Sequence, residues 1–391
     1  MHINAKEFCE RLNIEYHEEL DSYYEKGLNL YKEKGLFAID KERITYYHNK
    51  YNIFRKWFDD VIAACDAIKD DEDLIIFIYT LVAVIEDNAP LTIIPMPNRE
   101  SIETDHAPLF SLLYFLEDMV GDMEGRGVPH EVISDTLYGF DSEMNDYYSM
   151  FGRSGVRTYV SWFLLFVHKE IIRVGRFQMQ FKKFPDKIKA FEKDGDIKIL
   201  MDGVDVHKKG MLFGSKNQDD EAGKYYAEIT EDENGITGYP VDELGNCIPE
   251  KITLNGYKEF LKPGDDVISV HIPSDGPLDY EYSEKSYEET IRIAKECYPE
   301  YDFKAFTCWS WLMAKEIKQI MGRDTNITRF ADKYYSYPVS SQGNGVFAFL
   351  YNLPGPVDPK DLPEKSSMHK LVKKYLMDGN VLYERGGIRK F

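Results

Sequence analysis

The sequence predicts an α+β protein, with an all-helical N-terminal domain at residues 1–168 and a mixed α/β domain at residues 169–391. Two observations carry this prediction. Apolar residues recur at helical spacing up to residue 165, whereas from Ile171 onward they alternate as in a β-strand. Farther along, the order strand, loop, helix, strand between residues 263 and 311 is typical of a crossover unit with two parallel strands.

The helical domain is expected to contain one helix that is buried all round. Leu74–Ile85 is an uninterrupted apolar run that ends at Asp87-Asn88-Ala89-Pro90. Further helices are predicted from the apolar series Phe8, Leu12, Tyr16 and Leu20, from Ile53, Trp57, Val61 and Ala64, from Leu109 to Val120, and from Thr158 to Lys169. No part of this half places titratable side chains in a spacing that chemistry needs, so we interpret it as a scaffold or cap.

The second domain is expected to begin with one long strand over residues 171–181. Short strands are predicted at residues 197–201, 225–229 and 235–241, with turns rich in glycine and acidic residues between them. A last helix is predicted over Ser366–Met377.

The crossover unit is the informative part of the chain. In the predicted strand 267–272, alternation places Ile268, Val270 and Ile272 on one face, and Val267, Ser269 and His271 on the other. A loop follows, then a helix for which Ser286 and Glu289 predict a capping box. A second strand, residues 303–311, is expected to run directly into a helix at 312–321. In such units ligands bind beyond the carboxyl ends of the strands, which is where the loop 274–282 lies.

Composition limits the classes of function. Lys and Arg total 48 and Asp and Glu total 68, so the net charge of −20 disfavours a broad nucleic-acid surface. The five cysteines are far apart and form no C-x-x-C, which favours a reducing cytoplasm. The N-terminus is polar and unlike a signal peptide, and the longest apolar run is shorter than the ~20 residues of a membrane span. We therefore expect a cytoplasmic protein without a membrane span, and no side-chain spacing predicts a metal site.

Several patches resemble one known family in the right order. They are Ile172-Arg173-Val174-Gly175-Arg176-Phe177-Gln178, Gly238-Tyr239-Pro240, Leu261-Lys262-Pro263-Gly264-Asp265, Val270-His271-Ile272-Pro273-Ser274-Asp275-Gly276-Pro277-Leu278, Phe306-Thr307-Cys308-Trp309-Ser310-Trp311-Leu312 and Asn326-Ile327-Thr328-Arg329-Phe330. The chain thus resembles proteins that join an N-acyltransferase N-terminal helical domain to a GNAT-like C-terminal domain. The resemblance implies a GNAT-like acyltransferase fold and transfer of an acyl group from acyl-coenzyme A (acyl-CoA) to an unidentified amine, either a small molecule or a protein.

The same resemblance implies roles for residues of the crossover unit. The coenzyme's pantetheine arm would pair with the strand 267–272, and its diphosphate would lie on the loop formed by Ile272, Ser274, Asp275, Gly276 and Pro277. The acceptor amine would attack the thioester directly, with His271 or Glu281 as base and Tyr282 as a possible acid. Ser310 and Cys308, on one face of the second strand, complete the set of candidate catalytic residues.

Each candidate also has a structural interpretation. His271 could be a half-buried histidine of the strand, and Cys308 a small buried strand residue. Ser310 could form a hydrogen bond to the end of the following helix. Arg173 and Arg176 could meet a phosphate or form structural pairs. Trp309 and Trp311 are expected in the core.

Two features favour an alternative, a catalytically silent binding protein that keeps the fold. The loop contains a single glycine, and the loop with the following helical turns is acidic, with Asp275, Asp279, Glu281, Glu284, Glu288 and Glu289 against Lys285. A third possibility is carbohydrate binding, because the chain is rich in aromatic and acidic residues; it requires paired carboxylates at an aromatic groove.

Overall fold

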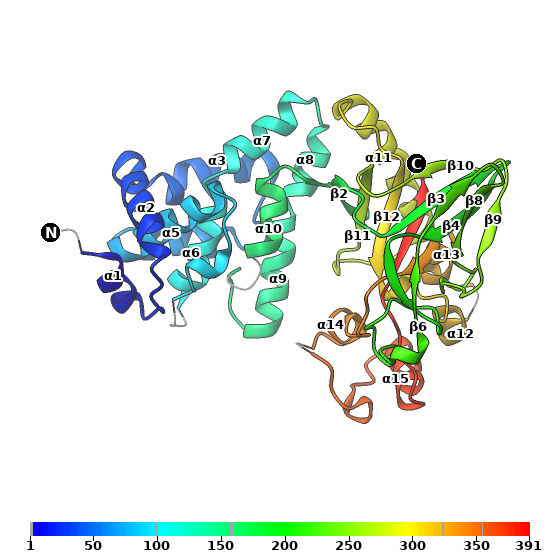
Figure 1. The fold of residues 1–391 in the computed structure, drawn as a ribbon. Coiled ribbons are helices and arrows are strands. Elements are labelled where there is room, and N and C mark those ends of the chain that lie inside the picture. The colour runs from blue at the N-terminus through cyan, green and yellow to red at the C-terminus, as the bar shows by residue number, and fades with distance from the viewer. Residues whose placement is uncertain (1–2, 98–100, 157–159, 323, 354) are drawn as a thin grey trace. The chain divides into compact units, whose positions relative to one another are not determined.

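A computed structural model describes residues 3–97, 101–156, 160–322, 324–353 and 355–391 (Figure 1). By their contacts these residues form two compact units, Met1–Val174 and Gly175–Phe391. The predicted fold class is confirmed. The first unit is helical as far as Val167, and the second unit combines β-sheets with helices.

Unit 1 is built around the buried helix α5. The sequence predicted this helix correctly: residues 74–85 are all buried, and the Asp71 carboxylate accepts a hydrogen bond from the Leu74 amide at its start. Helix α2 approaches it closely at Gly27, where a Cβ would lie 2.5 Å from the Thr80 hydroxyl oxygen. The elements of unit 1 are α1 (Ala5–Leu12), α2 (Leu20–Lys34), η1 (Phe37–Ile39), α3 (Lys41–Tyr51), α4 (Phe58–Ile68), α5 (Glu72–Glu86), η2 (Leu91–Ile93), α6 (Ile102–Leu113), α7 (Leu116–Gly125), α8 (His130–Leu137), α9 (Gly139–Phe151), α10 (Val160–Val167) and β1 (Ile171–Val174).

Two of the predicted helices are interrupted, and a third begins later than predicted. Helix α1 ends at Asn13 and α3 ends at Asn52, both in the left-handed conformation, with φ of 53° and 54°. The apolar series predicted from Ile53 begins in the turn after Asn52, which buries Ile53 and Phe54, and the helix α4 starts only at Phe58. Another break separates α6 from α7. The predicted helix start at Thr158 lies outside the described residues.

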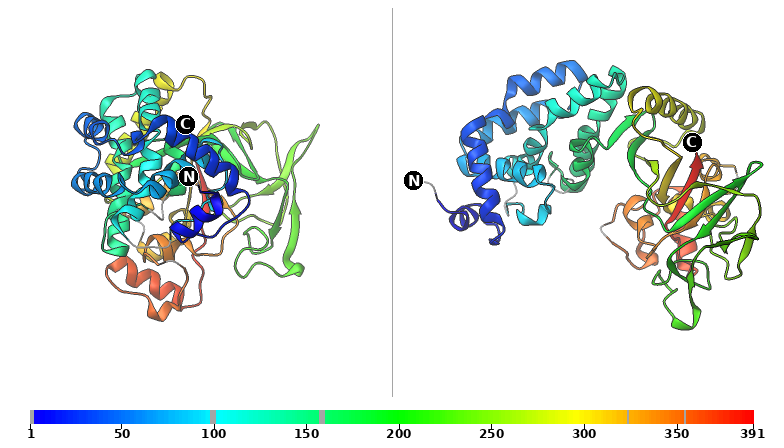
Figure 2. Two further views of the ribbon diagram at one scale, coloured as in Figure 1. Left: turned by 90° about the vertical axis from the view of Figure 1, so that its left-hand side faces the viewer. Right: turned by 45° about the horizontal axis from the view of Figure 1, so that its top comes forward.

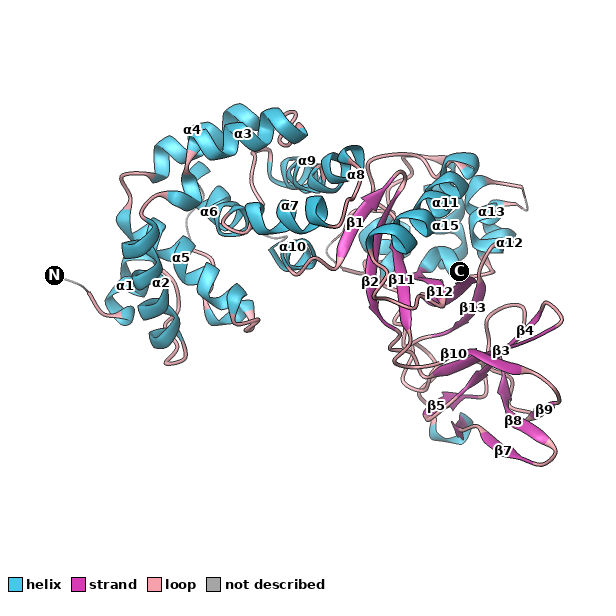
Figure 3. Ribbon diagram, turned by 90° about the horizontal axis from the view of Figure 1, so that it is seen from above, coloured by secondary structure: helices cyan, strands magenta, loops and turns pink. Residues whose placement is uncertain are grey.

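Unit 2 contains two main sheets. Within the unit, the first sheet has the strand order β2-β11-β12-β14-β13, and the second has the order β10-β3-β4-β8-β7 with β9 paired to β8. Figure 3 shows β3, β4, β8 and β9 grouped beside the first sheet. The strands are β2 (Phe177–Lys183), β3 (Ile188–Lys193), β4 (Asp196–Met201), β5 (Val204–His207), β6 (Lys224–Ala227), β7 (Thr230–Asp232), β8 (Gly235–Pro240), β9 (Ile252–Leu254), β10 (Lys258–Leu261), β11 (Asp266–His271), β12 (Ala305–Ser310), β13 (Tyr335–Pro338) and β14 (Arg385–Lys390).

The first sheet is covered on both faces. One face packs against the second sheet through a core that includes Val267, Ala305 and Ile388. On the other face lies α11, whose buried Tyr287 contacts the rings of Phe177 and Phe306. The helical elements of unit 2 are η3 (Glu221–Gly223), α11 (Tyr280–Cys297), η4 (Trp311–Met313), α12 (Ile317–Met321), α13 (Asn326–Asp332), α14 (Gly345–Phe349), η5 (Pro359–Asp361) and α15 (Ser367–Met377).

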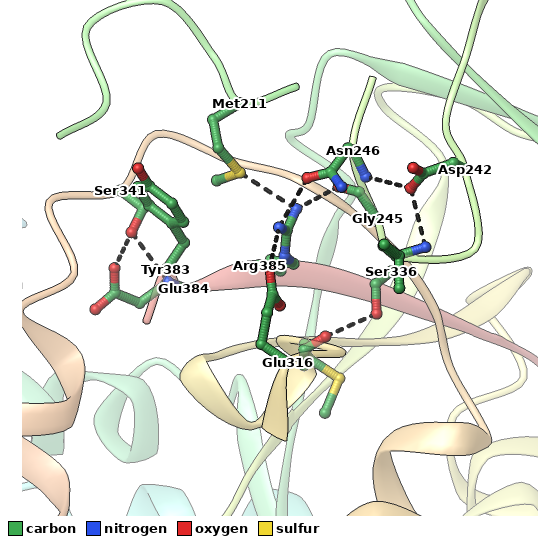
Figure 4. A network of polar contacts seen from close by, with 12 residues as sticks. Met211, Asp242, Gly245, Asn246, Glu316, Ser336, Ser341, Tyr383, Glu384 and Arg385 are labelled. Atoms are coloured by element: carbon green, nitrogen blue, oxygen red, sulfur yellow. Dashed lines mark hydrogen bonds and ion pairs between the residues drawn. The ribbon is translucent and has the colours of Figure 1, made fainter. Parts of the chain in front are cut away.

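Strand β14, red in Figure 2, lies between β12 and β13 and carries the buried Arg385. Its guanidinium donates to the Gly245 carbonyl and to Asn246 Oδ1, at 2.9 Å for the latter, and pairs with Glu316 at 3.1 Å (Figure 4). This network ties β14 to the turn after β8 and to the segment before α12. It therefore holds three distant parts of unit 2 together.

Three predictions in unit 2 need correction. The long strand predicted at 171–181 is two strands, because Gly175 turns the chain with φ of 57°. Helix α11 begins at Tyr280 with Asp279 as its N-cap, so the predicted capping box of Ser286 and Glu289 lies inside the helix and is wrong. The second strand ends in the short η4, and the helix expected at 312–321 starts only at Ile317.

Candidate active site

The two parallel strands part toward their carboxyl ends. Strands β11 and β12 pair over three positions, Val267–Ser269 with Ala305–Thr307. Beyond that point β11 continues beside β2 as far as His271, and β12 beside β14 as far as Ser310. Each strand thus stays attached to its outer neighbour while the pairing between the two ends. Such parting exposes backbone groups between the strands to a ligand.

The sheet register divides the candidate residues between two faces. Ser269 is opposite Gln180 on β2 and beside Thr307 on β12, so these three side chains share a face. His271 lies two residues after Ser269, and Trp309 two residues after Thr307, on that same face. Cys308 and Ser310 point to the opposite face, toward α11. The predicted catalytic residues are therefore not all brought together.

Buried polar side chains line the His271 face. Gln178, Ser269 and Thr307 are all nearly inaccessible and lie beside His271 in the register of β2, β11 and β12. The row places two hydroxyl groups and one amide next to the imidazole, so this face offers polar groups to a ligand. The sequence analysis missed Gln178 and Thr307, although the alternation of both strands was visible.

His271 is held as a neutral imidazole. Its Nε2 lies 3.0 Å from the Gln180 side-chain oxygen, so the proton is assigned to Nε2. Burial, together with the nearby Lys182 ammonium, lowers the pKa of His271 to about 4. At neutral pH the ring is consequently uncharged, with Nδ1 free of a proton, as a general base must be.

Trp309 and Asp186 lie at the edge of the same face. Trp309 is 56% exposed, contrary to the expected core position, and its indole N–H donates to Asp186 Oδ2 at 2.7 Å. The Tyr337 hydroxyl donates to the same oxygen. Burial raises the pKa of Asp186. Sequence reasoning missed Asp186, because its partners are more than a hundred residues away along the chain.

Cys308 and Ser310 have structural surroundings. Burial raises the pKa of the Cys308 thiol to about 12, so the thiolate that nucleophilic catalysis requires is scarce. The Ser310 hydroxyl accepts a hydrogen bond from the Leu312 amide at 3.1 Å and caps η4. Trp311 packs among α14 and α15, as expected of a core residue.

The predicted coenzyme loop is anchored from β2. Arg176 is only 4% exposed and its guanidinium donates to the carbonyl oxygens of Pro273, Gly276 and Pro277 at 2.7–2.8 Å. Arg176 and Asp275 form an ion pair at 3.8 Å. Helix α11 begins directly after this loop, and the N-terminal end of a helix carries a partial positive charge that favours an anion.

The acidic character of this region is largely compensated within the protein. Asp279 accepts the Tyr282 amide, Glu284 binds Arg389 through two hydrogen bonds of 2.8 Å, and Glu289 pairs with Arg292. Asp275 pairs with Arg176. Glu281 and Glu288 are exposed carboxylates of this acidic group. A diphosphate at the loop would therefore meet less repulsion than the sequence suggested.

The sequence of each half matches a known domain. The N-acyltransferase N-terminal domain matches residues 54–168, and the GNAT-like C-terminal domain matches residues 171–389, more than half of the chain. The chain belongs to this GNAT-like family. The family resemblance read from the sequence is thereby confirmed.

Solved structures share the fold of this GNAT-like protein at low identity. An acyltransferase in complex with decanoyl-CoA aligns over 100% of both chains, with 15% identity and a TM-score of 0.63. An acyltransferase in complex with decanoyl-CoA and teicoplanin aligns over 99% of both chains, with 14% identity and a TM-score of 0.63. An acyltransferase mutant in complex with octanoyl-CoA aligns over 100% of both chains, with 14% identity and a TM-score of 0.62. No curated protein matches by sequence.

Other features of the GNAT-like protein lie outside this site. Two surface cavities, of about 470 and 710 Å³, belong to unit 1 and are lined by residues around Lys41 and around His17. In the described ranges, no helix is long and apolar enough to cross a bilayer. The same ranges contain no cluster of three His, Cys, Asp or Glu side chains that could hold a metal ion.

Proposed function

We propose that this protein transfers an acyl group from acyl-CoA to the amine of a small molecule, without a covalent enzyme intermediate. The observation that carries the proposal is the parting of β11 and β12 after Ser269 and Thr307, in a chain where the loop and the N-terminus of α11 follow β11 directly. Membership of the GNAT-like family supports the reaction class. The similar structures that contain decanoyl-CoA, one of them together with teicoplanin, support a long-chain donor and a bulky small-molecule acceptor.

In this proposal His271 moves one proton from amine to thiolate. The neutral amine attacks the thioester carbon, forming the C–N bond and an oxyanion, and His271 takes a proton from the resulting ammonium. The oxyanion then collapses, the C–S bond breaks, and the imidazolium returns the proton to the leaving thiolate. An imidazolium with a pKa of about 4 is acidic enough to protonate a thiolate whose thiol has a pKa near ~8.5.

The buried hydroxyls complete the proposed site. Ser269 and Thr307 lie on the face of His271, where an O–H donor would stabilise the oxyanion. Ile272, Ser274, Asp275, Gly276 and Pro277 would form the coenzyme loop. Glu281 is exposed in the first turn of α11 and is the second candidate for the base.

Calorimetric titration of the full chain with decanoyl-CoA, acetyl-CoA and CoA tests the donor. We expect saturable binding, tighter for the long-chain thioester. Release of free CoA together with one equivalent of N-acyl product, measured with a panel of small amines, tests the transfer. Absence of binding at millimolar concentrations would refute the proposal, and binding without turnover by any amine would favour the silent alternative.

A further inference from the structure

We infer that Arg176 is a positioning residue for the coenzyme's diphosphate, which it serves by fixing the shape of the loop 273–279 rather than by touching the ligand. The inference rests on the proposed function, because it concerns the same loop. Loops that bring backbone amides close to a diphosphate are commonly rich in glycine, whereas the loop 273–279 has Gly276 alone and two prolines. Another device must therefore hold its backbone.

Arg176 supplies that device through three hydrogen bonds. Its Nε donates to the Pro277 carbonyl at 2.8 Å, and its Nη2 donates to the carbonyls of Pro273 and Gly276, both at 2.7 Å. A guanidinium presents its donors in a rigid planar fork, so three fixed acceptors define the course of the loop. The side chain is almost completely buried, which makes each of these bonds costly to break.

The direction of the carbonyls determines the direction of the amides. In a planar trans peptide the C=O of one residue and the N–H of the next point to opposite sides. Because the Pro273 and Pro277 carbonyls point at the guanidinium, the amides of Ser274 and Leu278 point away from it. Arg176 thus turns oxygen atoms inward and presents N–H groups on the outer side of the loop, where an anion would lie.

The turn that carries Arg176 is itself fixed to α11. The Arg176 amide donates to the Ser286 hydroxyl at 2.9 Å, and that hydroxyl donates to the Tyr282 carbonyl at 2.9 Å. Gly175 is required here, since a Cβ would lie 2.5 Å from the Ser286 oxygen and φ is 57°. The loop and the first turns of α11 are therefore both hydrogen-bonded to the turn that carries Arg176.

The test compares two thioester donors in Arg176→Lys and Arg176→Met. Decanoyl-CoA carries the diphosphate, whereas decanoyl-pantetheine carries the same thioester without it. We expect Arg176→Met to raise KM for decanoyl-CoA at least about tenfold, with kcat at saturation changed less than twofold and kcat/KM for decanoyl-pantetheine unchanged. Arg176→Lys, which keeps the charge and reaches fewer carbonyls, should give an intermediate KM.

Arg385→Lys is the matched control, because Arg385 is a second buried arginine of unit 2 that also donates to a backbone carbonyl. Arg385→Lys should lower the free energy of unfolding without changing the ratio of kcat/KM for decanoyl-CoA to kcat/KM for decanoyl-pantetheine. Equal effects of the Arg176 variants on both donors would overturn the inference, as would an unchanged KM for decanoyl-CoA. If Arg176→Met does not fold, Arg176→Lys decides by the same ratio. Failure of the wild-type chain to bind decanoyl-CoA would instead refute the proposed function.

Discussion

His271 and Cys308 lie on opposite faces of one sheet, although each follows the last paired position of the same two parallel strands. His271 shares its face with Ser269 and Thr307, whereas Cys308 is buried against α11. A thioester that enters on the His271 face is therefore out of reach of the Cys308 sulfur. This separation favours direct transfer over a route through an acyl-cysteine.

Cys308→Ala should retain acyl transfer. Removing a buried sulfur costs about 1–2 kcal/mol of unfolding free energy, through a small cavity, but leaves the opposite face intact. The check is kcat with decanoyl-CoA together with intact-protein mass spectrometry after mixing. An acyl adduct on the wild-type protein that is lost in Cys308→Ala, along with activity, would show that the thiol is the nucleophile.

His271→Gln should lower kcat by about 10²–10⁴, because a general base is removed while the hydrogen-bonding position of Nε2 is preserved. The wild-type rate should stay flat down to a pH near 4, apart from protonation of the acceptor, since His271 becomes protonated only there. Glu281→Gln is the matched variant for the rival base. A large loss in Glu281→Gln with normal activity in His271→Gln would assign the base to Glu281.

His271 should also make stability depend on pH. Its folded pKa of about 4 lies below the ordinary value of 6.5, so between these values the unfolded chain binds a proton that the folded chain does not. Stability should therefore fall as the pH drops from 6.5 to 4, by up to about 3 kcal/mol from this group. Urea unfolding at pH 7.0 and 4.5 should show a smaller fall in His271→Gln than in the wild type.

Local patterns were enough to predict the core helix of unit 1 and the two strands of the candidate site. Helix α5 is marked by a wholly apolar run, and β11 and β12 by alternation on either side of an amphipathic helix. The capping box predicted at Ser286 and Glu289 is wrong, because Asp279 caps α11. Only the fold shows that the Ser286 hydroxyl is used by the Arg176 amide.

The network around the site could not be predicted, because its contacts are distant in sequence. Arg176 meets its loop about a hundred residues farther along, and Asp186 meets Trp309 and Tyr337 at still greater separations. A local pattern carries no signal for such pairs. The division of His271 and Cys308 between faces likewise follows from the register of four strands rather than from either strand alone.

Gly276→Val should weaken coenzyme binding without unfolding the protein. A Cβ at Gly276 meets no atom within 4 Å, so the fold has room for a larger side chain. If a diphosphate lies on the loop, a branched side chain there competes with it, and Kd for decanoyl-CoA should rise about tenfold or more. Calorimetry measures the change, and the thermal unfolding temperature controls for stability. Unaltered affinity would place the diphosphate elsewhere.

Arg385→Met should destabilise unit 2 by about 3–5 kcal/mol, because it leaves the Glu316 carboxylate without its cation in a largely buried network. The Gly245 carbonyl and Asn246 lose a donor at the same time. Adding Glu316→Gln to Arg385→Met should restore part of the lost free energy of unfolding. The double variant no longer buries an unpaired carboxylate, so the remaining cost comes from uncharged groups that lack a partner. Urea unfolding of the two single variants and the double variant gives the coupling between the partners. A loss below about 1 kcal/mol in Arg385→Met would mean that this network contributes little to holding β14 in the sheet.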